Sequence, residues 1–413
     1  MIPFLRKQFN DAFTPEKYQA FLRRLDLVCG THVRFRLSET PCFFPKELID
    51  RMARDGAELI RQLVDSPAYL AKSDLAVPAE FKVPNEPGHP MFVQVDFGLV
   101  RDASGELQPK LVELQAFPSL YAYQGPLAEA YVEAYGLDAA SGFRLSASGS
   151  RAPEAGSLKY FLSGLETSSY RELLRRAIVA DHRDHLGAQP VHFLPAHQKT
   201  LPDFLLTEKM LGVRAVDILD VKKEGSHLYY ERDGKRVPIR RIYNRAIVDE
   251  LERKNIKLAF DWRDDLDVEW AGHPNWYFRI SKFSIPYLKH ASVPKTWFLD
   301  RVEEIPSDLD NYALKPLYSF AGLGVVIAPK KEDIAAIPAD KRCKYILQER
   351  MQFEPIIATP FGGTKAEVRV MYVWLEELTP VLTIIRMGRG MMMGVDHNKS
   401  MEWVGASAGL YLG

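Results

Sequence analysis

Apolar residues in the N-terminal region, up to about residue 90, recur mainly at helical spacing. From Pro45 to Val64 they fall on one face of a helical repeat, with polar residues on the opposite face. Pro45 opens this run, where the first turn of a helix tolerates proline. The apolar positions that carry the repeat are Leu48, Met52, Leu59 and Leu63. We therefore expect the N-terminal region to be mainly helical.

The pattern then changes from helical spacing to alternation. Residues 92–100 and 111–115 alternate apolar and polar side chains, and the turn-forming sequence Asp-Ala-Ser-Gly at 102–105 separates them. Two alternating runs around a glycine-containing turn predict a β-hairpin. Asp96 and Glu113 place one carboxylate on each strand. The hairpin is therefore expected to carry acidic groups.

The pattern of apolar and polar residues changes again after a Ser-, Gly- and Ala-rich stretch at 141–156. A helix is predicted at 170–179, and a strand, a helix and a strand are predicted after it. The segments that give this order are 191–194, 207–211 and 215–219. Such an order is typical of a small α/β domain.

A second hairpin is predicted to close that domain. Residues 228–232 and 236–239 are its strands, and Asp233 and Gly234 supply the positive φ angles of a tight turn. The sequence then predicts a helix at 281–290. The strands expected after this helix are 296–299, 312–315, 325–327, 345–348, 368–374 and 381–386.

These elements predict a mixed α/β (α+β) fold with three parts. The first part, 1–175, combines the helical region with the acidic hairpin, and the second, 176–275, is the small α/β domain. The third part, 276–413, contains the late strands. No internal repeat or long low-complexity tract interrupts them.

The amino-acid composition argues against some classes of binding partner. Lys plus Arg and Asp plus Glu number 54 each, so the chain lacks the basic field that holds nucleic acid phosphates. No apolar run approaches the length of a membrane span. Cys29, Cys42 and Cys343 lie far apart without the spacing of a zinc site or a disulfide framework. We expect a cytoplasmic protein that binds neither nucleic acid nor membrane.

The most informative motif begins at Lys315. This lysine ends a predicted strand, and a loop containing Gly322 and Gly324 leads to the next strand. Glycines let backbone N–H groups approach anionic oxygens, and the lysine adds a positive charge, which together favour polyphosphate binding. A glycine pair between strands is, taken alone, more often an ordinary hairpin.

A second polar strand end follows about thirty residues later. Residues 345–347 are apolar and lead to Gln348 and Glu349. Backbone amides and a carboxylate at such a strand end are suited to adenine and ribose. The alternative is an ordinary strand end without a ligand.

At these residues the sequence resembles the ATP-grasp superfamily, and specifically the synthetase half of glutathionylspermidine synthetase. The resemblance runs from about residue 92 to the C-terminus. It implies an ATP-grasp fold with a preceding pre-ATP-grasp-like domain at 176–275 and nucleotide-binding lobes at 276–413. The cofactor-binding residues that it implies are Lys282, Lys315, Ser319, Gly322, Gly324, Gln348 and Glu349.

That branch is circularly permuted, so its magnesium ligands lie early, on a hairpin. By resemblance, Asp96 and Glu113 are carboxylate ligands of magnesium, and Gln115 replaces an amide ligand. Hard oxygen ligands suit this ion. Independently of the family, two carboxylates on neighbouring strands repel unless a cation or a basic group lies between them. Simple salt bridges with basic neighbours are therefore the alternative.

The chain departs from the family at two positions. Gln94 stands where the family has a phosphate-facing arginine, and Phe117 stands where it has a second aspartate. These departures bear on catalytic competence and on the choice of substrate. Gln94 therefore remains in the predicted catalytic set together with two late arginines, Arg369 and Arg386, of which Arg386 is the stronger candidate.

Three further groups have competing interpretations. Asp396 and Asn398 could imitate the metal ligands of unpermuted ATP-grasp proteins, although a polar loop is the favoured alternative. Met391–Met393 could line a soft pocket or fill an irregular core. The third group could bind an acidic substrate or face solvent, and comprises Arg241, Tyr243 and Arg245.

The resemblance implies a ligase that uses ATP and Mg and forms an amide from a small-molecule acid and an amine through an acyl phosphate. Three alternatives stay open: an ATP-dependent phosphotransferase on the same fold, a catalytically inactive nucleotide-binding protein, and a structural α/β protein without a nucleotide site. The sequence identifies neither substrate and leaves the oligomeric state open. No N-terminal cysteine amidase arrangement accompanies the synthetase pattern.

Overall fold

The computed structural model describes most of the chain, and the predicted strand at 191–194 lies outside the described residues. So does the whole of the Ser-, Gly- and Ala-rich stretch at 141–156. The described residues are 1–138, 157–181, 189–190, 197–247, 251, 254–318, 322–394, 398 and 400–413. Within them, mixed α/β architecture is confirmed, and no helix is both long and apolar enough to cross a bilayer.

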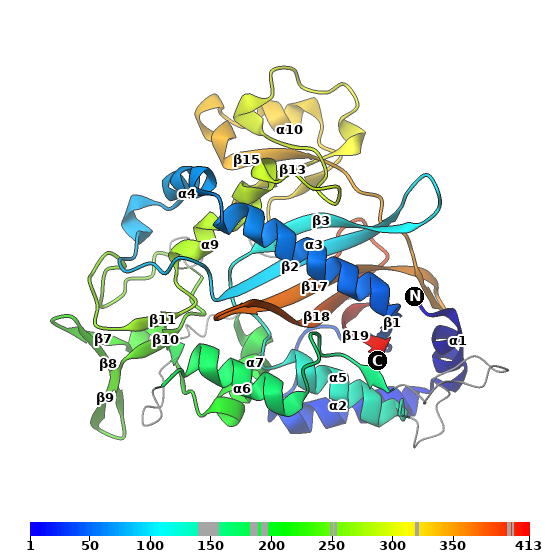
Figure 1. The fold of residues 1–413 in the computed structure, drawn as a ribbon, viewed down its shortest axis with the longest axis horizontal. Coiled ribbons are helices and arrows are strands. Elements are labelled where there is room, and N and C mark those ends of the chain that lie inside the picture. Colours follow the sequence, from blue (N-terminus) through cyan, green and yellow to red (C-terminus); the bar gives the residue numbers. More distant parts are fainter. Residues whose placement is uncertain are drawn as a thin grey trace.

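A large mixed sheet forms the centre of the molecule (Figure 1). Its strand order is β1 (Cys42–Phe44), β19 (Gly405–Leu412), β18 (Leu378–Gly388), β17 (Gly362–Trp374), β2 (Phe92–Arg101) and β3 (Leu107–Gln115). Two short strands, β16 (Ile357–Thr359) and β4 (Leu158–Lys159), pair with β17 and β19. The predicted acidic hairpin is confirmed as β2 and β3, and it pairs with the late strand β17.

Helices cover both faces of this sheet. One face packs against α3 (Lys46–Val64), which confirms the predicted helix and crosses the sheet in Figure 1. Its apolar face meets the inward side chains of β2, β17 and β18. Further helices are α1 (Pro3–Ala12), α2 (Pro15–Cys29), α4 (Pro67–Ser73), α5 (Gln124–Tyr135), α6 (Thr167–Ile178) and α7 (Leu201–Leu211). Of these, α2, α5 and α6 lie on the opposite side of the sheet from α3.

A second, antiparallel sheet of four strands lies beyond the β3 edge (Figure 1). Its order is β12 (Thr296–Phe298), β15 (Tyr345–Glu349), β13 (Tyr312–Pro316) and β14 (Val326–Ile327), with α10 (Lys331–Ala335) beside it. We call it the small sheet. All four strands fall within or next to predicted strands.

The connection that leads to the small sheet is where the sequence prediction was wrong. A helix over 281–290 is not formed; the chain instead makes α9 (Asn275–Arg279) and a 3-10 segment, η6 (Lys282–Tyr287). Pro286 lacks the backbone N–H that a continuous helix needs. Backbone bonds to the hairpin also hold this segment, since Ala116 N donates to Ile280 O at 3.2 Å.

The middle of the chain forms small sheets of its own. The predicted hairpin is confirmed as β8 (His227–Arg232) and β9 (Lys235–Ile239), with positive φ at Asp233 (50°) and Gly234 (71°). The predicted strand at 215–219 is shorter, because only Ala215–Val216 forms β6 before a 3-10 turn begins. The remaining strands here are β5 (Gln189–Pro190), β7 (Lys222–Glu224), β10 (Arg241–Tyr243) and β11 (Glu269–Ala271).

The three candidates for an acidic substrate in this region have structural contacts. Arg245 forms a buried ion pair with Asp203, Nη1 to Oδ2 at 2.5 Å. Arg241 donates to the carbonyl oxygens at the end of α6 and pairs with Glu269. Tyr243 is buried in an apolar cluster under the central sheet. All three side chains are buried, so the solvent-facing alternative is wrong.

Candidate functional site

Two adjoining cavities lie where the small sheet faces the central sheet. The larger has a volume of about 440 Å³ and the smaller about 210 Å³. Both are lined by Glu113, Lys282, Gly322 and Arg386. The larger cavity also contacts Lys315, Gln348 and Glu349, whereas Gln115 and Arg369 line the smaller one. Most of the predicted site residues are thus gathered around one cleft.

Lys315 reaches this cleft from the small sheet. It is the penultimate residue of β13, and its Nζ donates to Gln348 Oε1 on β15 at 2.6 Å. Gln348 Nε2 in turn donates to Thr296 Oγ1 on β12 at 3.0 Å. Burial lowers the pKa of Lys315 to about 8, although the nearby Glu113 carboxylate acts in the opposite direction. The lysine is therefore held in place, and its charge depends on pH near neutrality.

Lys282 lines the same cleft from the segment η6. It is the first residue of η6, and its Nζ lies 3.2 Å from Glu113 Oε2 on β3. Burial alone would raise the pKa of Glu113, but Lys282, Arg369, Arg386 and Lys315 together lower it to about 2. Glu113 therefore stays ionised throughout the neutral range.

Asp96 lies beneath the cleft between two arginines. Strand register places it directly opposite Glu113 on β3 and Arg369 on β17. Arg369 binds it in a bidentate pair, with Nε 2.5 Å from Oδ1 and Nη2 2.6 Å from Oδ2. Arg386 also contacts Oδ2, and it forms an ion pair with Glu367. Asp96 is completely buried, and it is not part of the lining of either cavity.

Gln94 supports this arrangement from below. It is completely buried, and its Oε1 accepts from Arg369 Nη1 at 2.9 Å. Its Nε2 donates to Ser119 O at 2.8 Å. Gln94 therefore touches a predicted catalytic arginine without lining the cavities. The amide of Gln94 thereby orients Arg369.

Two loops meet over the larger cavity. Gly322 and Gly324 have φ angles of 76° and 73°, a conformation that favours glycine. A Cβ on Gly322 would lie 2.9 Å from Met392 Cε, so the glycine loop and the methionine loop are in contact. Met391–Met393 line the cavity, as one interpretation of their sequence predicted. Ser319, predicted to lie in the glycine loop, is outside the described residues.

Asn398 holds the methionine loop and uses its whole side chain to do so. Oδ1 accepts from the backbone N–H groups of Arg389 and Gly390, and Nδ2 donates to the carbonyls of Met392 and Gly394. Its carbonyl oxygen therefore has a structural role, as the polar-loop alternative predicted. Its proposed partner Asp396 lies outside the described residues.

Glu367 is a site residue to which the sequence analysis assigned no role. It lies on β17 two residues before Arg369, it lines the larger cavity, and it is only 6% exposed. Burial raises its pKa to about 7, with Asp96 and Glu113 adding to the effect against Arg386. The sequence signal that could have identified Glu367 is its spacing from Arg369 within an apolar strand. Alternate residues of a strand share one face, so the two side chains point to the same side of the sheet.

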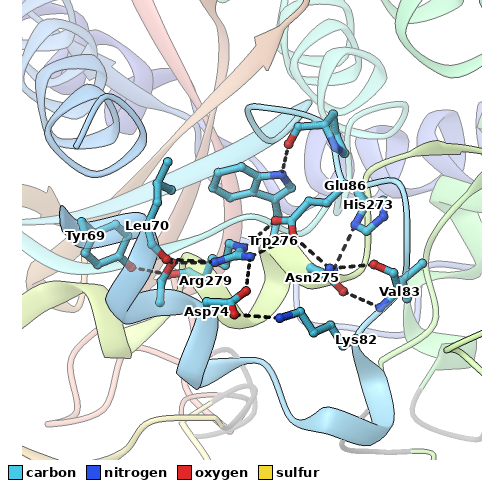
Figure 2. A network of polar contacts seen from close by, with 12 residues as sticks. Tyr69, Leu70, Asp74, Lys82, Val83, Glu86, His273, Asn275, Trp276 and Arg279 are labelled. Carbon is cyan, nitrogen blue, oxygen red and sulfur yellow. Dashed lines mark hydrogen bonds and ion pairs between the residues drawn. The ribbon is translucent and has the colours of Figure 1, made fainter. Parts of the chain in front are cut away.

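A network of polar contacts outside the cleft fixes the segment that carries Lys282 (Figure 2). Arg279, at the end of α9, binds Glu86 through Nε–Oε1 (2.5 Å) and Nη2–Oε2 (2.9 Å), and Asp74 Oδ1 at 2.9 Å. Asn275 bonds both the N–H and the carbonyl of Val83. The stretch around residues 69–87 is thereby tied to the chain directly before Lys282.

The carboxylates of the cleft can be compared with what a magnesium ion requires. Glu113 and Glu367 face the larger cavity, whereas both oxygens of Asp96 already accept from guanidinium groups. In the part of the chain that the structure describes, no three His, Cys, Asp or Glu side chains form a metal-binding group. Magnesium in nucleotide sites commonly takes one or two carboxylates together with phosphate oxygens, so the available carboxylates fit that pattern.

The two-lobed arrangement with a cleft between sheets is a glutathione synthetase-like fold. A structure of a glutathione synthetase-like effector from Globodera pallida, in its apo form, aligns with a TM-score of 0.57 and 11% sequence identity. The alignment covers 99% of this chain and 97% of that one. No protein-family profile matches the sequence, and no curated protein matches it significantly. At this identity the likeness establishes the fold.

Proposed function

We propose that this chain is a Mg-ATP-dependent ligase of the ATP-grasp type that joins a carboxylate to an amine. The observation that carries the proposal is a single cleft in which Lys282, Lys315 and Arg386 surround the larger cavity. Three cations around one cavity suit a polyphosphate, because each neutralises part of its charge. The glutathione synthetase-like fold is compatible with the same class of reaction.

In this proposal the nucleotide lies along the small sheet. Gln348 and Glu349 end β15 at the cavity and meet adenine and ribose, while Lys315 and Lys282 contact the phosphates. Gly322 and its loop cover the phosphates with backbone N–H groups and exclude water. Magnesium supplies charge neutralisation between phosphate groups when bound, and the carboxylates that face the cleft would hold it.

The chemistry follows from the position of Arg386 at the junction of the two cavities. An oxygen of the substrate carboxylate attacks the γ-phosphorus, the bond to the bridging oxygen breaks, and ADP leaves. Arg386 and Lys282 stabilise the charge that develops during this transfer. The amine then attacks the acyl carbon, loses a proton and expels phosphate, which leaves an amide.

The smaller cavity is where the acid and the amine are proposed to meet. It adjoins the proposed phosphate end of the larger cavity through their shared lining, and Gln115, Ser281 and Tyr318 are among the residues that line its walls. A volume of about 210 Å³ suits a small acid or the end of a peptide better than a bulky apolar group.

The test is ADP and phosphate release measured with panels of small acids, with and without amines. A ligase releases both products only when acid and amine are present together, and hydroxylamine intercepts the acyl phosphate. A stable phosphorylated product formed without an amine would favour the phosphotransferase alternative. Binding of a nonhydrolysable ATP analogue without turnover would favour an inactive nucleotide-binding protein, and no binding at all would refute the nucleotide site.

A further inference from the structure

We propose that Glu113 and Glu367 supply the carboxylate ligands of the magnesium-nucleotide, and that Asp96 is instead a positioning residue for Arg369 and Arg386. The inference rests on the nucleotide site of the proposed function. It assigns a ligand, Glu367, that the family pattern does not predict, and it gives Asp96 a different role from the one predicted by resemblance.

The surroundings of Asp96 leave no oxygen facing the cleft. Its side chain has no exposed surface, and Arg369 occupies both carboxylate oxygens in a bidentate pair. Arg386 adds a further contact to Oδ2. A metal ion at Asp96 would have to displace two guanidinium groups. Each displaced guanidinium would then be a buried charge without its partner, which is energetically costly. The pairs orient both arginines beneath the phosphate site.

Glu367, unlike Asp96, lines the larger cavity. It is more than nine-tenths buried, and its Oε1 forms an ion pair with Arg386. A carboxylate can accept at about four sites on its two oxygens, so a single ion pair leaves Glu367 able to bind a cation in the cavity. Glu113 lines the same cavity, so the two carboxylates share one space.

The neighbouring strand explains why Glu367 is free to face the cavity. Its register partner on β2 is Gly98, which has no side chain. A Cβ at Gly98 would lie 2.2 Å from the ring of Phe353, and that ring also lines the larger cavity. Glu367 therefore has a glycine and an aromatic ring on one side and Arg386 on the other. No second acid from β2 competes for a cation at this level of the sheet.

Manganese tests the ligand assignment without requiring turnover. Mn²⁺ binding is measured by electron paramagnetic resonance in the presence of a nonhydrolysable ATP analogue, for the wild type and for Glu113→Gln, Glu367→Gln and Asp96→Asn. Loss of a true ligand weakens Mn²⁺ binding by about tenfold or more, at least as much as loss of an outer-shell partner. The expected result is such a loss for both glutamate variants and retained affinity for Asp96→Asn.

Glu332→Gln, on the exposed surface of α10, is the matched control and leaves Mn²⁺ binding unchanged. Loss of Mn²⁺ affinity in Asp96→Asn, or its retention in Glu367→Gln, would overturn the inference. Thermal unfolding identifies variants that do not fold, and Asp96→Glu then provides a variant that keeps the charge. A wild type that binds no nucleotide would instead refute the proposed function.

The positioning role of Asp96 has its own readout. Asp96→Asn weakens the hold on Arg369 and Arg386, so kcat for the ligase reaction falls while KM for Mg-ATP stays close to the wild-type value. Asp96→Glu restores part of kcat because it returns the negative charge. A merely structural role would change protein stability without separating kcat from KM, and that result would contradict the assignment.

Discussion

Lys315 and Gln348 are joined across neighbouring strands of the small sheet, with Nζ 2.6 Å from Oε1. The amide of Gln348 is fixed in turn by Thr296, so the lysine is oriented before any nucleotide binds. This pre-organisation reduces the conformational entropy that binding would otherwise cost. The pair links the edge of the cavity proposed for adenine to the part proposed for phosphate.

Replacing Lys315 by methionine should weaken nucleotide binding. The variant keeps the length of the side chain but removes a charged donor, which typically contributes about 1.5–3 kcal/mol to a hydrogen bond, or roughly a tenfold to hundredfold change in Kd. Calorimetric titration with a nonhydrolysable ATP analogue measures the change. Lys331→Met, on the exposed face of α10, is the control and should bind as the wild type does. Equal affinities would refute the phosphate role of Lys315.

Nucleotide affinity should fall as the pH rises through about 8. Burial lowers the pKa of Lys315 to about 8, so the free protein loses this positive charge above that pH while Glu113 stays ionised. Phosphate favours the charged lysine, so binding at pH 8.5 should take up protons, as titrations in buffers of different ionisation enthalpy would reveal. Lys315→Arg should bind without this pH dependence, because arginine remains charged.

The same pKa shift predicts how Lys315 affects folding. Its folded pKa lies below the ordinary lysine value of 10.5, so the folded state holds this proton less firmly than the unfolded state does. The contribution of Lys315 to stability therefore rises as the pH increases from about 8 towards 10.5. Comparing urea unfolding of the wild type and Lys315→Met at pH 7 and pH 9.5 tests this sign. A contribution that decreases over this interval would contradict it.

Gly322→Ala should weaken nucleotide binding through the loop. The backbone has a φ of 76°, and the added methyl group meets Met392, so the loop must move or strain. Gly105→Ala is the matched control, since its φ is 86° but it lies in the β2–β3 turn with open space around it. Both variants should lose roughly 1–2 kcal/mol of stability. Only Gly322→Ala should bind the ATP analogue less tightly, and equal binding by the two variants would argue against the loop.

Replacing Arg279 by methionine should destabilise the protein and disturb Lys282. The change leaves Glu86 and Asp74 without their guanidinium partner, which we expect to cost about 3 kcal/mol, the low end for buried pairs, because Asp74 is partly exposed. Urea unfolding monitored by circular dichroism measures this loss. Arg263→Met breaks an exposed pair with Asp261 and should reduce stability much less, because water screens that pair. Similar losses for both variants would contradict the structural role of the network.

Much of the local structure could be predicted from the sequence. The helical spacing of apolar residues from Lys46 to Val64 and the alternation around the Asp102–Gly105 turn each depend on consecutive residues, and both elements formed as expected. The helix predicted at 281–290 failed for a local reason as well. The proline at 286 and the bonds to the hairpin outweighed the apolar pattern.

Sequence also indicated which side chains are chemically important, because Lys315 before a glycine loop and acids on a hairpin are unusual in apolar strands. The tertiary structure alone decided which charges meet. Asp96 and Arg369 are 273 residues apart, and they face each other only because β2 pairs with β17 in one register. A one-residue slip would turn each side chain to the other face. The periodicity of apolar residues depends only on residues close together in the sequence. Contacts across a sheet depend on burial and on strand register, which the whole fold determines.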